Sequence, residues 1–82
     1  MKITFTKNEW KHLDTISAYT DLLPSEDKVK KGDKYIVDLS HQDWDEISDF
    51  VAGEANHAES SYMESKFDDL YDKIEEHMLA NN

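Results

Sequence analysis

Apolar and polar residues alternate at two places in the first half of the chain, and each place predicts a β-strand. Ile3 and Phe5 alternate with polar neighbours, which is typical of a short strand with one apolar face. Residues 35–39 are rich in aromatic and β-branched side chains, which favour extended backbone. We expect these two strands to pair, with the intervening helix across their shared face.

Between the strands, apolar residues return every three or four positions and predict a helix from Lys7 to Leu22. Thr6 and Glu9 have the spacing of a capping box, in which each side chain accepts a hydrogen bond from the other residue's backbone N–H. Pro24 ends the pattern, because its ring cannot continue the helical hydrogen bonds. The helix is therefore expected to begin at a strong cap and to stop before the proline.

The segment 25–34 is polar, and we expect a loop there with a tight turn at Gly32-Asp33. The path of this loop decides the direction in which the two strands pair. A direct crossover would favour parallel pairing. An extra strand at residues 28–30 would instead allow an antiparallel hairpin, and both alternatives stay open.

Residues 40–79 carry two amphipathic stripes that predict a helical hairpin. Ser40, followed by Asp43 at the third helical position, has the pattern of an N-cap. The first stripe consists of Trp44, Ile47, Val51, Ala55 and Ala58, with Phe50 beside it. The second stripe consists of Met63, Phe67, Leu70, Ile74 and Met78.

The phase of the apolar pattern changes after Ala58, which predicts a short turn near residues 59–61. Ser61 and Glu64 repeat the capping-box spacing at the start of the second helix. A single bent helix is the alternative, because Gly53 is tolerated inside a helix at a cost of about 1 kcal/mol.

Together these elements predict an α+β fold in the order β-α-β-α-α, with a two-stranded β element and a C-terminal helical hairpin. A chain of 82 residues is too short to divide its core, so we expect one domain over residues 1–82, with a β-α-β part (1–39), an acidic helical hairpin (40–79) and a flexible tail (80–82). The predicted core consists of Trp44, Ile47, Val51, Phe67, Leu70 and Ile74 within the hairpin, of Trp10, Leu13, Ile16, Ile36 and Val37 above it, and of the bulky Tyr35, Phe50 and Tyr71.

Charge is divided unevenly between the two halves. The net charge is −10, and residues 38–82 hold thirteen acidic residues against two lysines. Within both predicted helices of this half, acidic residues recur at four-residue steps. Like charges at this spacing repel by roughly 0.2–0.5 kcal/mol per pair. A helix face that serves solubility alone would more often mix positive and negative charges. A solvated face without a binding role is the alternative. The residues of the predicted partner-binding surface are Asp45, Asp49, Glu64, Asp68, Asp72 and Glu76.

Composition argues against several classes of function. Without cysteine there is no disulfide framework and no thiol chemistry. Arginine is also absent, and an acidic chain that lacks it is poorly suited to bind nucleic acid directly. The sequence has neither a signal-peptide pattern nor a membrane-spanning run, so we expect a cytoplasmic protein without membrane contact. No catalytic constellation stands out, and we expect no enzymatic activity and no cofactor.

Glu54 and His57 form a Glu-x-x-His pair, one helical turn apart, as found among the ligands of carboxylate-bridged di-iron bundles. Such sites require a second pair, and the residue three positions before His77 is Ile74. Metal binding through Glu54 and His57 is therefore a minor alternative.

In size, acidity and lack of a catalytic motif the chain resembles the DNA-mimic proteins of phages and plasmids that block restriction, CRISPR or repair enzymes. The resemblance is one of composition and transfers no residues. It implies a non-enzymatic protein-binding inhibitor that occupies the nucleic-acid-binding surface of a basic partner, such as a nucleic-acid-binding enzyme. The alternative is a structural or assembly protein that forms a homodimer through its C-terminal helices, nucleated by exposed Tyr19, Tyr62 or Phe50.

Overall fold

The computed structural model describes residues 1–81 and confirms the α+β fold. Strands β1 (Lys2–Thr6), β2 (Lys30–Lys31) and β3 (Lys34–Asp38) form one antiparallel sheet in the order β1-β3-β2. The β element therefore has three strands rather than two, and the third is the short strand that makes an antiparallel path possible.

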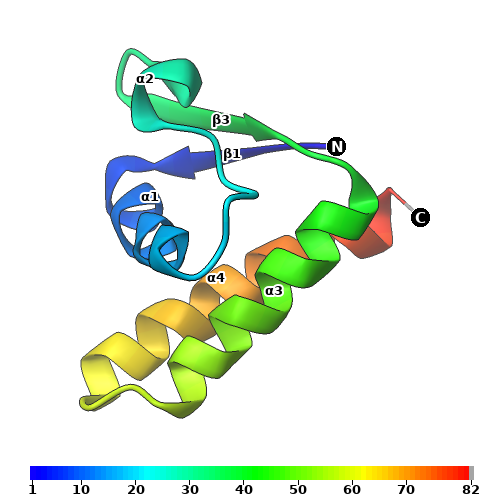
Figure 1. Cartoon of the computed structure of the whole chain (residues 1–82). Helices are drawn as coiled ribbons and strands as arrows, with labels where there is room; N and C mark the ends of the chain where they lie inside the picture. The colour runs from blue at the N-terminus through cyan, green and yellow to red at the C-terminus, as the bar shows by residue number, and fades with distance from the viewer. Residues whose placement is uncertain (82) are drawn as a thin grey trace.

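Three longer helices lie on one side of this sheet (Figure 1). Helix α1 (Lys7–Leu13) lies directly beneath the strands, and α3 (His41–Asn56) and α4 (Ser61–Ala80) lie side by side as an antiparallel hairpin below it. Two separate helices are thus present, and the alternative of a single bent helix was wrong.

The segment before β2 differs from the expected loop. Residues Glu26–Val29 form a one-turn helix, α2, and Val29 is buried in the core. Because residues 28 and 29 belong to this helical turn, the additional strand that was considered at residues 28–30 is instead β2, which begins at Lys30. Gly32 lies in the predicted tight turn, with a φ of +62°.

The two glycines predict opposite effects of substitution by alanine. A left-handed φ is strained for any residue with a Cβ, so Gly32→Ala should lower the free energy of unfolding by about 1 kcal/mol. Gly53 lies inside α3 with open space where a Cβ would stand. Gly53→Ala should therefore raise the free energy of unfolding by about 0.5–1 kcal/mol. Urea denaturation of both variants tests this, and equal shifts in one direction would contradict it.

The first helix is shorter than predicted. It ends at Leu13 and continues as a 3₁₀ helix, η1 (Asp14–Ala18), followed by irregular chain rather than helix up to Leu22. The hydroxyls of Thr15 and Ser17 donate to backbone carbonyl oxygens three residues earlier, at 2.6 and 2.7 Å. Such side chains compete for backbone hydrogen bonds and favour tight turns over continued α-helix.

Both predicted caps at the starts of α1 and α3 are confirmed. Thr6 and Glu9 form the reciprocal capping box, and Ser40 accepts a hydrogen bond from the backbone N–H of Asp43. The cap of α4 was predicted one residue too late, because Ser60 rather than Ser61 accepts the bond from the N–H of Met63.

Helix α4 also runs further than the predicted boundary at residue 79. It extends through Ala80, and the N–H of Asn81 donates to the carbonyl oxygen of His77. The flexible tail predicted for residues 80–82 thus begins within this helix, and residue 82 lies outside the described residues.

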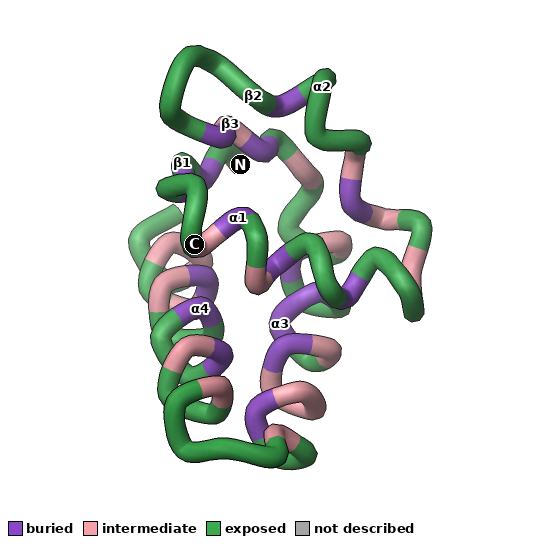
Figure 2. Tube along the Cα trace, turned by 90° about the vertical axis from the view of Figure 1, so that its left-hand side faces the viewer, coloured by how far each residue is buried: buried purple, intermediate pink, exposed green. Residues whose placement is uncertain are grey.

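The buried residues form one cluster between the sheet, α1 and the hairpin (Figure 2). The predicted hairpin residues are all in it, but Ile36 is only partly buried, because it alternates with Tyr35 and Val37 and points to the other face of the sheet. Tyr71 was expected inside and is 36% exposed. Leu23 and Val29 also belong to the core, although neither was among the predicted core residues.

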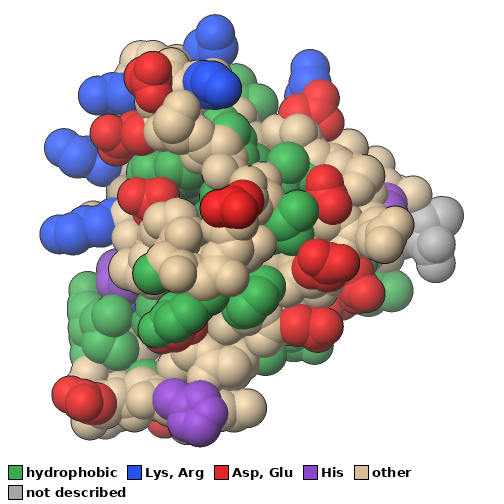
Figure 3. Space-filling view, viewed as in Figure 1, with side chains coloured by type: hydrophobic (Ala, Val, Ile, Leu, Met, Phe, Trp, Pro, Cys, Tyr) green, Lys and Arg blue, Asp and Glu red, His purple; other side chains and the backbone are tan. Residues whose placement is uncertain are grey.

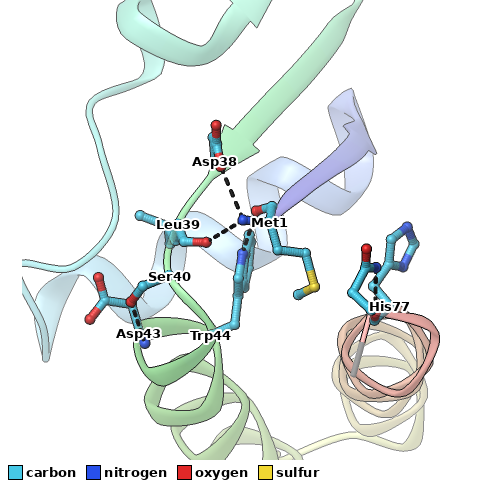
Figure 4. Close-up of polar contacts among 8 residues, drawn as sticks. Met1, Asp38, Leu39, Ser40, Asp43, Trp44 and His77 are labelled. Atoms are coloured by element: carbon cyan, nitrogen blue, oxygen red, sulfur yellow. Dashed lines mark hydrogen bonds and ion pairs between the residues drawn. The ribbon is translucent and has the colours of Figure 1, made fainter.

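Trp44 joins the two halves of the molecule at the start of β1 (Figure 4). Its indole N–H donates to the carbonyl oxygen of Met1 at 2.9 Å. The amino group of Met1 in turn donates to Asp38 and to the carbonyl oxygen of Leu39, at 3.2 and 2.7 Å. The end of β3, the start of β1 and the first turn of α3 are therefore fastened at one point.

Among residues 1–81, no helix is both long enough and apolar enough to cross a membrane.

Candidate functional site

The hairpin presents a row of exposed carboxylates on its outer side. All six predicted partner-binding residues are exposed, with Asp45 and Asp49 on α3 and the others on α4. Phe67, Leu70 and Ile74 occupy the opposite, buried side of α4. At 1.5 Å per residue, the α4 row from Glu64 to Glu76 extends over roughly 18 Å.

Two further carboxylates belong to this surface and were missed in the sequence. Asp69 is exposed and Glu75 is partly exposed, and both lie beside the row on α4. The strict four-residue spacing left them out, although neighbouring positions on the same helical side could have found them. We call the set the acidic face: Asp45, Asp49, Glu64, Asp68, Asp69, Asp72, Glu75 and Glu76.

The two lysines of α4 do not interrupt the acidic face. Lys73 turns toward the sheet, where its ammonium group lies 2.9 Å from the Glu9 carboxylate and 5.1 Å from the centre of the Phe5 ring. Lys66 lies over the ring of Tyr62, at 5.2 Å. At about 100° per residue, Lys66 and Lys73 share the side of α4 that faces α1. The outward side of α4 therefore carries carboxylates without neutralising partners on the same helix.

Glu9 holds Lys73 in this inward position. One carboxylate oxygen of Glu9 accepts hydrogen bonds from the Thr6 backbone N–H at 2.8 Å and from the Lys73 ammonium at 2.9 Å. Burial acts to raise the pKa of the Glu9 carboxyl, but the Thr6 bond and the positive charge of Lys73 outweigh it and lower the pKa. The pair therefore stays charged, and the capping box of α1 also fastens α4.

Tyr71 connects the α3 and α4 parts of the acidic face. The charge of Glu75 is the main cause that raises the pKa of the Tyr71 hydroxyl, together with partial burial, and Asp49 and Asp72 add to the shift. Asp49 comes from α3, whereas Glu75 and Asp72 come from α4. Their negative fields therefore overlap at this tyrosine, and the two predicted rows meet here.

The lysines occupy only part of the surface, whereas acidic side chains occur throughout it. Figure 3 shows lysine side chains along the upper and left margins of one face, with acidic side chains both among them and on the remainder of that face. The sequence of α3 contains five acidic positions from Asp43 to Glu54, without any lysine among them. An open hollow of about 370 Å³ lies on this helix, lined by Glu46, Asp49 and Phe50.

The two candidate metal ligands lie at the C-terminal end of α3. Glu54 is partly buried near the end of α3, and His57 is its exposed C-cap. In the part of the chain that the structure describes, no three His, Asp or Glu side chains are grouped so that they could hold a metal ion. Tyr19 and Tyr62 are 62% and 63% exposed, whereas Phe50 is only partly exposed.

No protein-family model matches the sequence, and no curated protein and no solved structure gives a significant match.

Proposed function

We propose that the protein is a non-enzymatic binding module whose acidic face docks on a basic protein surface. The partner would be a nucleic-acid-binding protein, and the module would occupy its nucleic-acid-binding surface in the manner of a DNA mimic. The protein would act in the cytoplasm, where such partners are found.

The observation that carries this proposal is the one-sided arrangement of charge on the hairpin. Lys73 is held toward the sheet by Glu9 and Lys66 lies over the exposed Tyr62 ring at the margin of the acidic face, while the carboxylates of both helices are exposed. Like charges at this spacing disfavour the helix that bears them. A binding role explains why they are gathered, because a field of one sign accelerates encounter with a partner of the opposite sign and excludes partners of the same sign.

The test is to remove the charge of the α4 row while its shape is kept. We expect a variant with four of these carboxylates converted to amides to bind the basic partner at least about tenfold more weakly, because each substitution removes one charge–charge attraction to the partner. Affinity is measured by titration calorimetry against a partner captured from host lysate, at low and at moderate salt. The substitutions are Glu64→Gln, Asp68→Asn, Asp72→Asn and Glu76→Gln.

A matched control removes the same number of charges from exposed aspartates outside the hairpin. If only net charge matters, this control should weaken binding as much as the α4 variant does, and the proposal fails. Displacement of the protein by DNA from the captured partner would support the mimic. Retention of nothing but the protein's own copies would favour assembly through Tyr19 or Tyr62 instead. The control substitutions are Asp14→Asn, Asp21→Asn, Asp27→Asn and Asp33→Asn.

A further inference from the structure

The outer edge of β1 carries backbone groups that the sheet does not use. Met1 and Leu39 exchange two hydrogen bonds, since each N–H donates to the other's carbonyl oxygen, at 2.7 and 3.1 Å. In an antiparallel pair, hydrogen-bonded positions alternate along the strand. Ile3 and Phe5 therefore direct their backbone groups toward β3, and Lys2, Thr4 and Thr6 direct theirs away from it.

One of these outward groups has a partner within the chain. The N–H of Thr6 donates to Glu9 as part of the capping box. By this register the N–H and C=O groups of Lys2 and Thr4 point away from β3, and within residues 1–81 they form no backbone hydrogen bond in a turn, loop or cap; both residues are exposed. An edge strand with free backbone groups is a template to which another extended segment can add.

Helix α4 lies on the same side of the molecule as this edge. Lys73 lies over Phe5, and Figure 2 shows α4 below β1 on that side. A hollow of about 330 Å³ continues from the end of β1 to α4, lined by Thr6, Asn8, Glu9, Lys66, Asp69 and Leu70. Asp72 and Glu76 lie within roughly 60° of Asp69 around the helix axis. An occupant of the edge would therefore have Asp69 of the acidic face beside it, with Lys66 lining the same hollow and Lys73 already paired with Glu9.

We infer that the free edge of β1 receives an extended, lysine- or arginine-bearing segment of the partner protein, which adds as a fourth strand. This inference rests on the proposed function and names the form in which the basic partner binds. Backbone hydrogen bonds to Lys2 and Thr4 hold the segment, and its basic side chains reach the carboxylates of Asp69, Asp72 and Glu76. A second copy of the chain is disfavoured at this edge, because it would bring another acidic α4 against the first.

The experiment uses a capped peptide of alternating lysine and threonine as the probe, at low salt. Binding should slow the hydrogen exchange of the Lys2 and Thr4 amides in the NMR spectrum, while the already bonded amide of Thr6 changes less. The comparison peptide has the same charge but carries N-methyl groups at alternate residues, so it cannot donate to a strand edge. We expect it to bind about five- to tenfold more weakly, as the loss of one or two backbone hydrogen bonds would give.

Two variants of the protein distinguish binding through the backbone of β1 from binding through the charge of the acidic face. Thr4→Pro removes the outward N–H and should weaken binding of the unmethylated peptide about fivefold or more, while Thr4→Val keeps that N–H and should bind as the wild type does. Equal binding of both peptides, with the Lys2 and Thr4 amides unchanged, would overturn this inference and leave the acidic face as the binding site. Failure of both peptides to bind would overturn the proposed function as well. Protection of these amides that grows with protein concentration alone would assign the edge to a second copy and overturn the inference.

Discussion

Replacing Trp44 with alanine is expected to lower the free energy of unfolding by about 3–5 kcal/mol. The side chain is fully buried, its ring lies 6.0 Å from that of Phe5, and its N–H is bonded to the carbonyl oxygen of Met1. Alanine would leave a cavity at the point where α3 meets the start of β1, and the Met1 carbonyl oxygen would keep only one of its two donors, the Leu39 N–H. A domain of this size has a total stability of about 4–12 kcal/mol, so the variant should be largely unfolded at moderate urea.

Trp44→Phe separates the contribution of ring packing from that of the indole hydrogen bond. It keeps an aromatic ring in the core and removes the N–H that Met1 accepts, so we expect a loss of about 1–2 kcal/mol. Urea denaturation followed by far-ultraviolet circular dichroism measures both variants. An alanine variant as stable as the phenylalanine variant would show that the cavity collapses and that Trp44 does not join the two halves.

Phe67→Ala is expected to lower the free energy of unfolding by about 3–4 kcal/mol, whereas Phe50→Ala should lower it by about 1–2 kcal/mol. Phe67 is 3% exposed, and its ring meets that of His12 edge-on with the centres 6.0 Å apart. It therefore fixes α4 against α1. Phe50 is only partly buried and borders an open hollow on α3, where water can fill the space that the ring leaves.

The two phenylalanines are controls for each other, because the chemical change is the same and only the surroundings differ. Thermal denaturation by calorimetry, with urea midpoints as a second measure, gives the difference in stability. Equal losses at the two positions would contradict the assignment of Phe67 to the core and of Phe50 to its margin.

These stability effects are separable from the proposed binding. The substitutions in the α4 row lie on the side opposite Phe67, Leu70 and Ile74, and they relieve repulsion between like charges. The variant that carries these four substitutions should keep the wild-type fold, with an unchanged or slightly higher free energy of unfolding. A loss of binding in that variant would then report on the acidic face itself.

Local patterns in the sequence were enough to predict the class of the fold and most of its boundaries. The capping box of Thr6 and Glu9 and the Ser40 cap depend on residues within one helical turn, so their chemistry can be recognised without any tertiary contact. The apolar stripe of α4 identified Phe67 as a core residue for the same reason, since periodicity alone selects the buried side of a helix.

Tertiary packing decided part of what the sequence left open or predicted wrongly, and local structure that the pattern did not indicate decided the rest. Tyr71 lies at the border of the α4 stripe, and only the packing of α4 in the folded protein decides that its side chain is exposed. The direction of the strands depended on how residues 26–31 fold, and local hydrogen bonds of Thr15 ended the predicted long helix early.

The candidate site divides in the same way. The sequence by itself determined that the hairpin is acidic and that its carboxylates recur on one side, because charge and helical period are properties of the chain. Only the tertiary structure decided that Lys73 turns inward to Glu9, so that it does not neutralise that side, and that the edge of β1 stays open beside α4. The physical reason is that both features depend on distant parts of the chain. The direction of the Lys73 side chain depends on Glu9, more than sixty positions away. The free edge of β1 depends on how the whole sheet packs.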